Sequence, residues 1–137
     1  MIYTHVVIVD DEVDHAVISR MVLAQVAPGL DVETHTDLVG LEVRLHAVPQ
    51  DALVIVDRML GRVESFDLVR ALKRVRPDLT VVLVSAVLTP EDRRRALESG
   101  ASDTAEKPGD LEGWRALFRR LLSGGDGSAS KALGGVA

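Results

Sequence analysis

Three continuous apolar runs constrain the fold of this chain most strongly. The runs are VVIV at residues 6–9, LVIV at residues 53–56 and VVLV at residues 81–84. Apolar and polar residues do not alternate within them, which is typical of strands buried on both faces, as in a parallel sheet. The runs are therefore predicted to be central strands of such a sheet.

Helical patterns and one weaker strand separate the first two runs. Apolar residues repeat at helical spacing after the first run, at Val13, Val17, Met21 and Ala24. The Pro28-Gly29 pair ends this helix. A shorter strand is expected at residues 30–35 and a second helix at about residues 37–47.

The remainder of the chain continues the alternation. A third helix is expected at about residues 64–76, ending before Pro77 because a proline ring disfavours helical backbone in the residue before it. Thr89-Pro90 starts a fourth helix and Gly100 ends it.

Residues 101–106 form a weak, polar strand in this scheme, and Asp110 starts the last helix. The apolar face of that helix is predicted at Leu111, Trp114, Leu117 or Phe118, and Leu121. A strand followed by a helix thus occurs five times, which favours an α/β fold with a parallel sheet and helices on both faces.

Composition favours one acidic folded domain. The chain has 137 residues, 47% of them hydrophobic, and no cysteine, which excludes disulfides and thiolate metal sites. A net charge of −5 argues against a nucleic-acid-binding surface.

We expect the domain at residues 1–122 and a flexible Gly/Ser-rich tail or linker at residues 123–137. Neither a signal peptide nor a membrane helix is predicted, so a cytoplasmic location is expected.

Polar residues follow the predicted strands. Asp10-Asp11 follow the first, Asp57 the third, Ser85 the fourth and Lys107 the fifth. The carboxyl ends of parallel strands lie at one edge of the sheet, where open α/β sheets bind ligands. These side chains are therefore expected to share one cleft.

The residue types in this cleft suggest phosphate chemistry. Three carboxylates need a cation to coexist, and oxygen ligands suit Mg²⁺ or Mn²⁺. Ser85 and Lys107 are good partners for phosphate oxygens. A carboxylate can itself attack phosphorus and form an aspartyl phosphate, so the set predicts a site that places phosphate on an aspartate.

The ordered motifs resemble those of response-regulator receiver domains of two-component systems over about residues 4–122. The motifs are Val-Asp10-Asp11-Glu, Val-Ile-Val-Asp57 with Leu60-Gly61, Val-Ser85-Ala86, and Gly100-Ala101 with Lys107-Pro108. The resemblance implies a flavodoxin-like (βα)5 doubly wound sheet with strand order 2-1-3-4-5. It also implies a regulator that accepts a phosphoryl group from a histidine kinase or phosphotransfer protein and then changes its affinity for a partner. Such a domain is not a turnover enzyme.

The same resemblance assigns roles to individual residues. Asp57 would be the phosphoacceptor. Asp10, Asp11 and Asp57 would hold the metal ion, with the backbone carbonyl of Met59 as a further ligand. Ser85 would be the switch hydroxyl, Lys107 would pair with the phosphate, and the Lys107-Pro108 bond would be cis. Expected partners are the phosphodonor and a downstream protein, without direct nucleic-acid or membrane binding, in a monomer or a phosphorylation-linked dimer.

Three residues depart from the family pattern in ways that matter for function. Met59 and Val87 flank the expected phosphate and cannot hydrogen-bond the water that hydrolyses it, so we expect slow self-dephosphorylation. Thr104 stands at a switch position where the family usually has Tyr or Phe. Because Thr104 cannot fill a ring-sized pocket, the loop at residues 86–89 is expected to carry the conformational change.

Simpler interpretations and other functions remain open. Asp10-Asp11, Asp57 and Ser85 could be cap or turn residues, and Lys107 an exposed charge. The four histidines show no metal-binding spacing and are interpreted as structural or exposed, and the arginines at residues 93–95 as a solvated helix face. The main alternative function is a phosphorylation-independent, receiver-like interaction module. A phosphomonoester hydrolase of the dehalogenase type is disfavoured because it requires Asp-x-Asp, and the sequence here is Asp57-Arg58-Met59.

Overall fold

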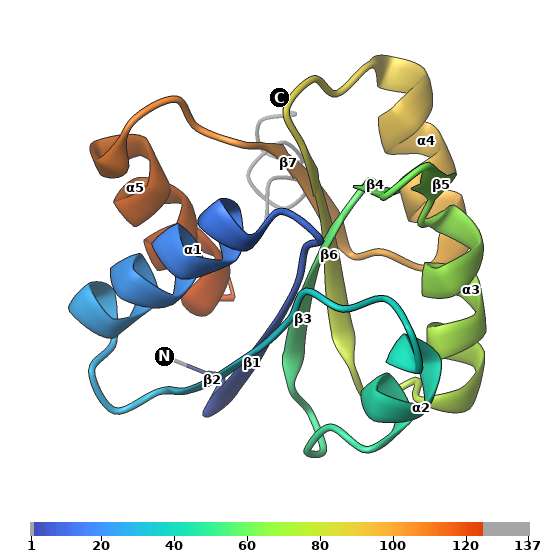
Figure 1. Cartoon of the computed structure of the whole chain (residues 1–137), viewed down its shortest axis with the longest axis horizontal. Coiled ribbons are helices and arrows are strands. Elements are labelled where there is room, and N and C mark those ends of the chain that lie inside the picture. The colour runs from blue at the N-terminus through green and yellow to red at the C-terminus, as the bar shows by residue number, and fades with distance from the viewer. Residues whose placement is uncertain (1, 125–137) are drawn as a thin grey trace.

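A five-stranded parallel sheet forms the centre of the computed structural model, which describes residues 2–124 (Figure 1). In spatial order its strands are β2 (Asp31–His35), β1 (His5–Val9), β3 (Leu53–Asp57), β6 (Thr80–Ser85) and β7 (Asp103–Glu106). Strands β4 (Met59–Leu60) and β5 (Val63–Glu64) form a separate antiparallel hairpin. Without that hairpin the order is 2-1-3-4-5, so the predicted fold class and strand order are confirmed.

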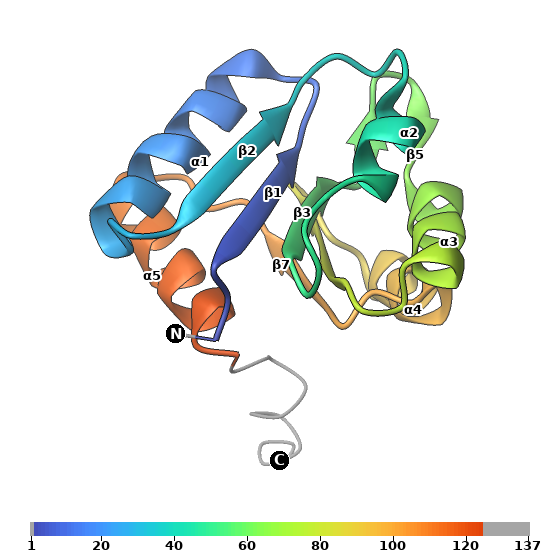
Figure 2. The same cartoon turned by 90° about the horizontal axis from the view of Figure 1, so that it is seen from below.

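Helices cover both faces of the sheet (Figure 2). One layer is α1 (Val13–Val26) and α5 (Leu111–Leu122), and the other is α2 (Leu41–His46), α3 (Phe66–Val75) and α4 (Pro90–Ser99). Val6 and Ile8 of β1 pack in the first layer, whereas Val7 and Val9 pack in the second. Because successive residues of a strand point to opposite faces, both faces are buried, and this explains the uninterrupted apolar runs.

Two helices are shorter than the sequence pattern predicts. Helix α2 begins at Leu41 because Gly40 before it has a φ of +72°, in the left-handed region that glycine tolerates. Helix α3 begins at Phe66 because Glu64 belongs to the β4–β5 hairpin. The predicted start of α4 is confirmed, since the Thr89 hydroxyl accepts a hydrogen bond from the Asp92 backbone N–H at 3.0 Å.

The apolar stripe of α1 lies on the outside of the molecule. Val13, Val17 and Met21 are exposed, whereas Val22 and Leu23 are fully buried against the sheet. The spacing thus predicted the helix correctly but does not mark its buried face. In α5 the predicted Leu111 is also exposed, and the other predicted apolar positions, Trp114, Leu117, Phe118 and Leu121, are buried.

A carboxylate shared by two histidines joins β1 to the edge strand β2. Glu33 lies 2.6 Å from the ring nitrogen of His5 and 2.6 Å from that of His35. Burial raises the pKa of Glu33, but the hydrogen bonds and charges of His35 and His5 outweigh it, so the pKa lies below its ordinary value. Two of the four histidines therefore have a structural role, as the sequence interpretation expected.

Replacing Glu33 by glutamine is expected to lower stability in a pH-dependent way. A lowered folded-state pKa contributes stability that is present above the unfolded pKa and is lost as pH falls through the folded pKa. The loss should be at most about 1 kcal/mol at neutral pH and should become smaller at an acidic pH at which Glu33 is protonated in both the folded and the unfolded chain. Urea unfolding at both pH values measures it, with the exposed Glu42→Gln as control. An equal loss at both pH values would contradict the assignment.

The predicted domain boundary falls at the end of the described part of the chain. Helix α5 ends at Leu122, and residues 125–137 of the expected tail lie outside the described residues. None of the helices within residues 2–124 is long and apolar enough to cross a membrane.

Candidate functional site

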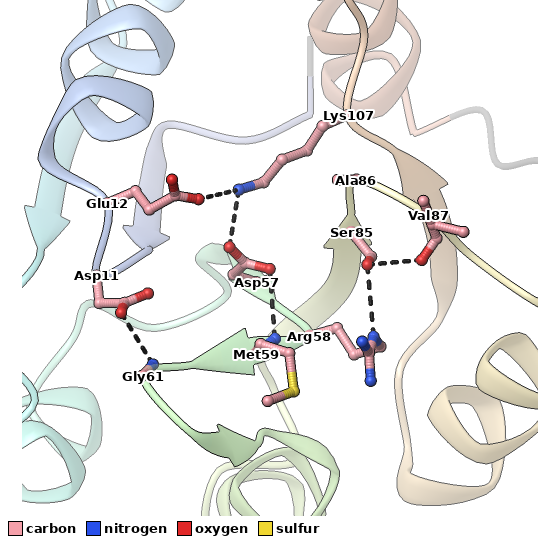
Figure 3. Close-up of a pocket in the computed structure, with 10 residues that line it drawn as sticks. All are labelled: Asp11, Glu12, Asp57, Arg58, Met59, Gly61, Ser85, Ala86, Val87 and Lys107. Carbon is pink, nitrogen blue, oxygen red and sulfur yellow. Dashed lines mark hydrogen bonds and ion pairs between the residues drawn. The ribbon is translucent and has the colours of Figure 1, made fainter.

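The carboxyl ends of the central strands border a pocket of about 390 Å³ (Figure 3). Strand β3 ends at Asp57, and β6 ends at Ser85. Lys107 directly follows β7, and its backbone N–H donates to the Ser85 carbonyl at 2.8 Å, which fixes the strand ends beside each other. Asp11, Asp57, Ser85 and Lys107 all line the pocket, as predicted from their positions after the strands.

Lys107 joins two carboxylates at the centre of the site. Its Nζ donates to Asp57 Oδ2 at 2.7 Å and to Asp10 Oδ2 at 2.9 Å. The Lys107 side chain is only 7% exposed. Burial lowers the pKa of Lys107, but its bonds to Asp57 and Asp10 outweigh this, so the pKa is raised and the ammonium is charged. Burial, together with the charge of Asp10, raises the pKa of the Asp57 carboxyl despite the opposing effect of Lys107.

Three carboxylates form a group with the geometry of a cation site. Asp10, Asp11 and Asp57 each offer an oxygen within 4.8 Å of the others. Backbone groups orient them: Glu12 N–H donates to Asp10 Oδ1 at 2.9 Å, and Gly61 N–H donates to Asp11 Oδ2 at 2.9 Å. Oxygen ligands from few carboxylates suit Mg²⁺ or Mn²⁺, so the residues present fit the expected ion.

The Ser85 hydroxyl points toward Val87 and Arg58 and lies apart from the Lys107 ammonium (Figure 3). The hydroxyl donates to the Val87 carbonyl at 2.7 Å and accepts a hydrogen bond from Arg58 Nε at 3.4 Å. A hydroxyl has one hydrogen, so Ser85 can donate to a pocket ligand only after it leaves the Val87 carbonyl.

The expected cis bond between Lys107 and Pro108 is not present. No peptide bond within residues 2–124 is cis, so this prediction is wrong. The trans form is the lower-energy state of most X-Pro bonds, by about 0.5–1 kcal/mol. Lys107 reaches both carboxylates in this form because its backbone is anchored to Ser85 and its side chain is long.

A sequence model described as the response regulator receiver domain matches residues 6–119. The chain belongs to this family. The predicted family resemblance is thereby confirmed, and the match covers every strand end that borders the pocket.

A curated DNA-binding regulator resembles this chain in sequence. The "DNA-binding dual master transcriptional regulator RpaA" of Synechocystis sp. (strain PCC 6803) is 31% identical over 120 residues. That match covers 85% of this chain and 48% of the relative, so the chain spans about half the length of that curated relative.

Solved structures support the fold alone, because their identity is low. The receiver domain of a DNA-binding response regulator (merR) from Colwellia psychrerythraea 34H is 19% identical with a TM-score of 0.74, covering 87% of this chain and 98% of that one. A CheY-like receiver from Methanospirillum hungatei JF-1 is 19% identical with a TM-score of 0.73, covering 90% and 96%.

Two side chains of this receiver that the sequence interpretation missed lie at the site. His15 was interpreted as structural or exposed, but its Nδ1 accepts a hydrogen bond from Lys107 Nζ at 2.9 Å. Arg58 lines the pocket. The sequence signals for them are weak: His15 lies in the first turn of the helix that follows Asp10-Asp11, and Arg58 directly follows Asp57.

Thr104 lies in a polar network in place of the usual aromatic ring. It is 5% exposed, and its hydroxyl accepts a hydrogen bond from Arg93 of α4 at 2.7 Å. The neighbouring Asp103, 1% exposed, accepts from Arg93 at 3.3 Å and from Arg120 of α5 at 2.8 Å. Arg93 therefore does not belong to a solvated helix face, which corrects the prediction for this residue, whereas Arg94 is exposed as predicted.

Proposed function

We propose that this protein is a cytoplasmic two-component response regulator that accepts a phosphoryl group on Asp57 and then changes its affinity for a partner protein. The donor would be a sensor histidine kinase or a histidine phosphotransfer protein. One observation carries the proposal: the Asp57 carboxylate lies 2.7 Å from Lys107 Nζ in a pocket that also holds Asp11 and Ser85. This set supplies a nucleophile, a cation, a metal ligand and a hydroxyl for one phosphoryl group.

Each residue of the set has a chemical task in this proposal. A carboxylate oxygen of Asp57 forms a bond to phosphorus while the P–N bond of the donor phosphohistidine breaks, and the electron pair of that bond stays on the imidazole nitrogen. Lys107 stabilises the negative charge on the phosphoryl oxygens, and Ser85 donates to one of them. Asp10, Asp11, Asp57 and the Met59 carbonyl would hold Mg²⁺ or Mn²⁺, which would neutralise further phosphoryl charge.

A small phosphodonor separates the proposal from its alternatives. After incubation with phosphoramidate and Mg²⁺, the mass of the protein should rise by one phosphoryl group, and chelation of Mg²⁺ should prevent the rise. A phosphorylation-independent interaction module would show no rise under either condition. Steady turnover of a phosphomonoester would instead indicate a hydrolase, in conflict with a phosphoacceptor that is not a turnover enzyme.

The molecule that the phosphorylated protein would bind is proposed to be another protein. The relative RpaA is named as DNA-binding, but the chain spans only 48% of it. A net charge of −5 does not favour direct DNA contact by this chain. We therefore propose that phosphorylation regulates a protein–protein contact, in a monomer or a phosphorylation-linked dimer.

Self-dephosphorylation is expected to be slow, and two substitutions should accelerate it. Met59 and Val87 line the pocket, and neither side chain can orient a water molecule toward phosphorus. Met59→Asn or Val87→Glu should increase the rate about tenfold, because each supplies a group that hydrogen-bonds water. The rate is measured as phosphate loss after donor removal, with Val75→Glu on α3 as control. A wild-type lifetime of seconds, or unchanged rates in both variants, would contradict the prediction.

A further inference from the structure

Arg58 connects the pocket hydroxyl to helix α4. Its Nε donates to Ser85 Oγ at 3.4 Å and lies 3.8 Å from Asp92 Oδ2, and its Nη1 donates to Glu64 Oε2 at 3.2 Å. The Arg58 side chain is only 23% exposed, and its guanidinium points toward Ser85 (Figure 3). One planar cation therefore contacts a pocket residue and two carboxylates outside the pocket.

Both carboxylates connect Arg58 to α4: Asp92 lies in that helix, and Glu64 contacts a residue of it. Asp92 closes the first turn of that helix, since its Oδ2 accepts from the Thr89 backbone N–H at 3.2 Å and thereby completes the capping box. Glu64 lies 3.3 Å from Arg95 Nη2 on the same helix. Arg95 also stacks over the Phe66 ring at 4.2 Å, which fixes its position. Arg58 thus reaches α4 directly at Asp92 and through Glu64 at Arg95.

A phosphoryl group on Asp57 would disturb this arrangement at Ser85. The phosphoryl group carries a charge of about −2 in place of the single negative charge of the carboxylate, and it brings three strong acceptor oxygens into the pocket. The single Ser85 hydrogen is now donated to the Val87 carbonyl. When the Ser85 hydroxyl rotates to donate this hydrogen to a phosphoryl oxygen, the lone pair that accepts from Arg58 Nε rotates as well. The Arg58 guanidinium then either loses its hydrogen bond to Ser85 or moves with the hydroxyl.

Thr104 stands at the position where the family usually has a mobile aromatic ring, and its contacts hold it in place in this protein. The Thr104 hydroxyl accepts from Arg93, and Arg93 is held by the buried Asp103. Because moving Arg93 would take one of two guanidinium partners from a buried carboxylate that Arg120 also holds, this network resists rearrangement. Arg58 has no such buried partner, since Glu64 and Asp92 are 41% and 16% exposed.

We propose that Arg58 is the positioning residue that transmits to helix α4 whether the Ser85 hydroxyl donates to the Val87 carbonyl or to a phosphoryl oxygen. This inference rests on the proposed phosphorylation of Asp57. Loss or movement of the Arg58–Ser85 contact changes the hold of Arg58 on Asp92 and Glu64. The start of α4 and the position of Arg95 then differ between the two states of the protein.

The test compares backbone amide spectra of the full chain before and after treatment with phosphoramidate and Mg²⁺, while mass spectrometry measures the phosphorylated fraction of the same samples. In wild type, amides at residues 85–88 and at Asp92 and Arg95 should shift. At matched phosphorylated fraction, Arg58→Ala should keep the shifts at residues 85–88 and lose most of those at Asp92 and Arg95. Arg58→Lys, which keeps the charge but not the planar fork, should recover part of them.

A matched control and a phosphate-free experiment complete the test. Arg62→Ala removes the same charge from an exposed residue in the turn of the neighbouring β4–β5 hairpin and should leave the α4 response unchanged. In the unphosphorylated protein, Ser85→Ala should shift the amides of Asp92 and Arg95 in wild type but not in the Arg58→Ala background. If the wild type gains no mass, the proposed function fails, and this second comparison still decides the role of Arg58. Equal α4 shifts with and without Arg58 would overturn the inference.

Discussion

Asp57→Asn should take up no phosphoryl group from phosphoramidate and Mg²⁺ under conditions in which the wild-type mass rises. The substitution keeps the shape of the side chain but removes the nucleophilic carboxylate, and an amide oxygen does not form a stable acyl phosphate. The fold should survive, because the amide oxygen of the new side chain can still accept from the Met59 backbone N–H, which lies 3.3 Å from Asp57 Oδ1 in the wild type. Intact-protein mass and peptide mapping measure the effect.

The same substitution has an expected consequence for stability. Burial raises the pKa of Asp57, so the ionised carboxylate is less favourable in the folded chain than in the unfolded chain. The contribution of Asp57 to the free energy of unfolding is therefore fully present below its unfolded-state pKa and is lost as pH rises through its folded-state pKa. In metal-free buffer the variant should therefore be at least as stable as wild type at neutral pH. Asp67→Asn, at an exposed position of α3, is the control for both measurements. A phosphorylated Asp57→Asn protein would show that another residue is the acceptor.

Lys107→Ala should slow phosphoryl uptake by about 100-fold or more, which is the usual cost of removing one preorganised charge from a transition-state site. It should also reduce stability by about 1–3 kcal/mol without metal, because Asp10 and Asp57 would remain buried without their common cation. Stopped-time mass measurements give the rate, and urea unfolding gives the stability.

Metal affinity gives an independent readout of the same site. Lys107 and a cation compete for Asp10 and Asp57, so Lys107→Ala should bind Mg²⁺ more tightly in a calorimetric titration even though it reacts more slowly. Lys107→Arg, which keeps the charge, should restore part of the rate. Wild-type uptake kinetics in Lys107→Ala would remove Lys107 from the reaction.

The sequence was sufficient for the sheet and for the residues at its edge. Continuous apolar runs indicate strands buried on both faces, and the alternation with helices makes them parallel. Parallel strands present their carboxyl ends at one edge, so the polar residues after the runs had to meet. Asp57, Ser85 and Lys107 could therefore be placed in one pocket from their positions in the sequence alone.

Only the tertiary structure decided which side chains surround that set. The apolar stripe of α1 has helical spacing but faces outward, because helical spacing alone does not say which side meets the sheet. His15 meets Lys107 across 92 positions, and Arg58 meets Ser85 across 27. Such contacts depend on side-chain directions from separate elements. Local patterns determine the backbone course and the strand ends, whereas the charges around Asp57 and Thr104 are arranged by packing between helices and strands that are distant in sequence.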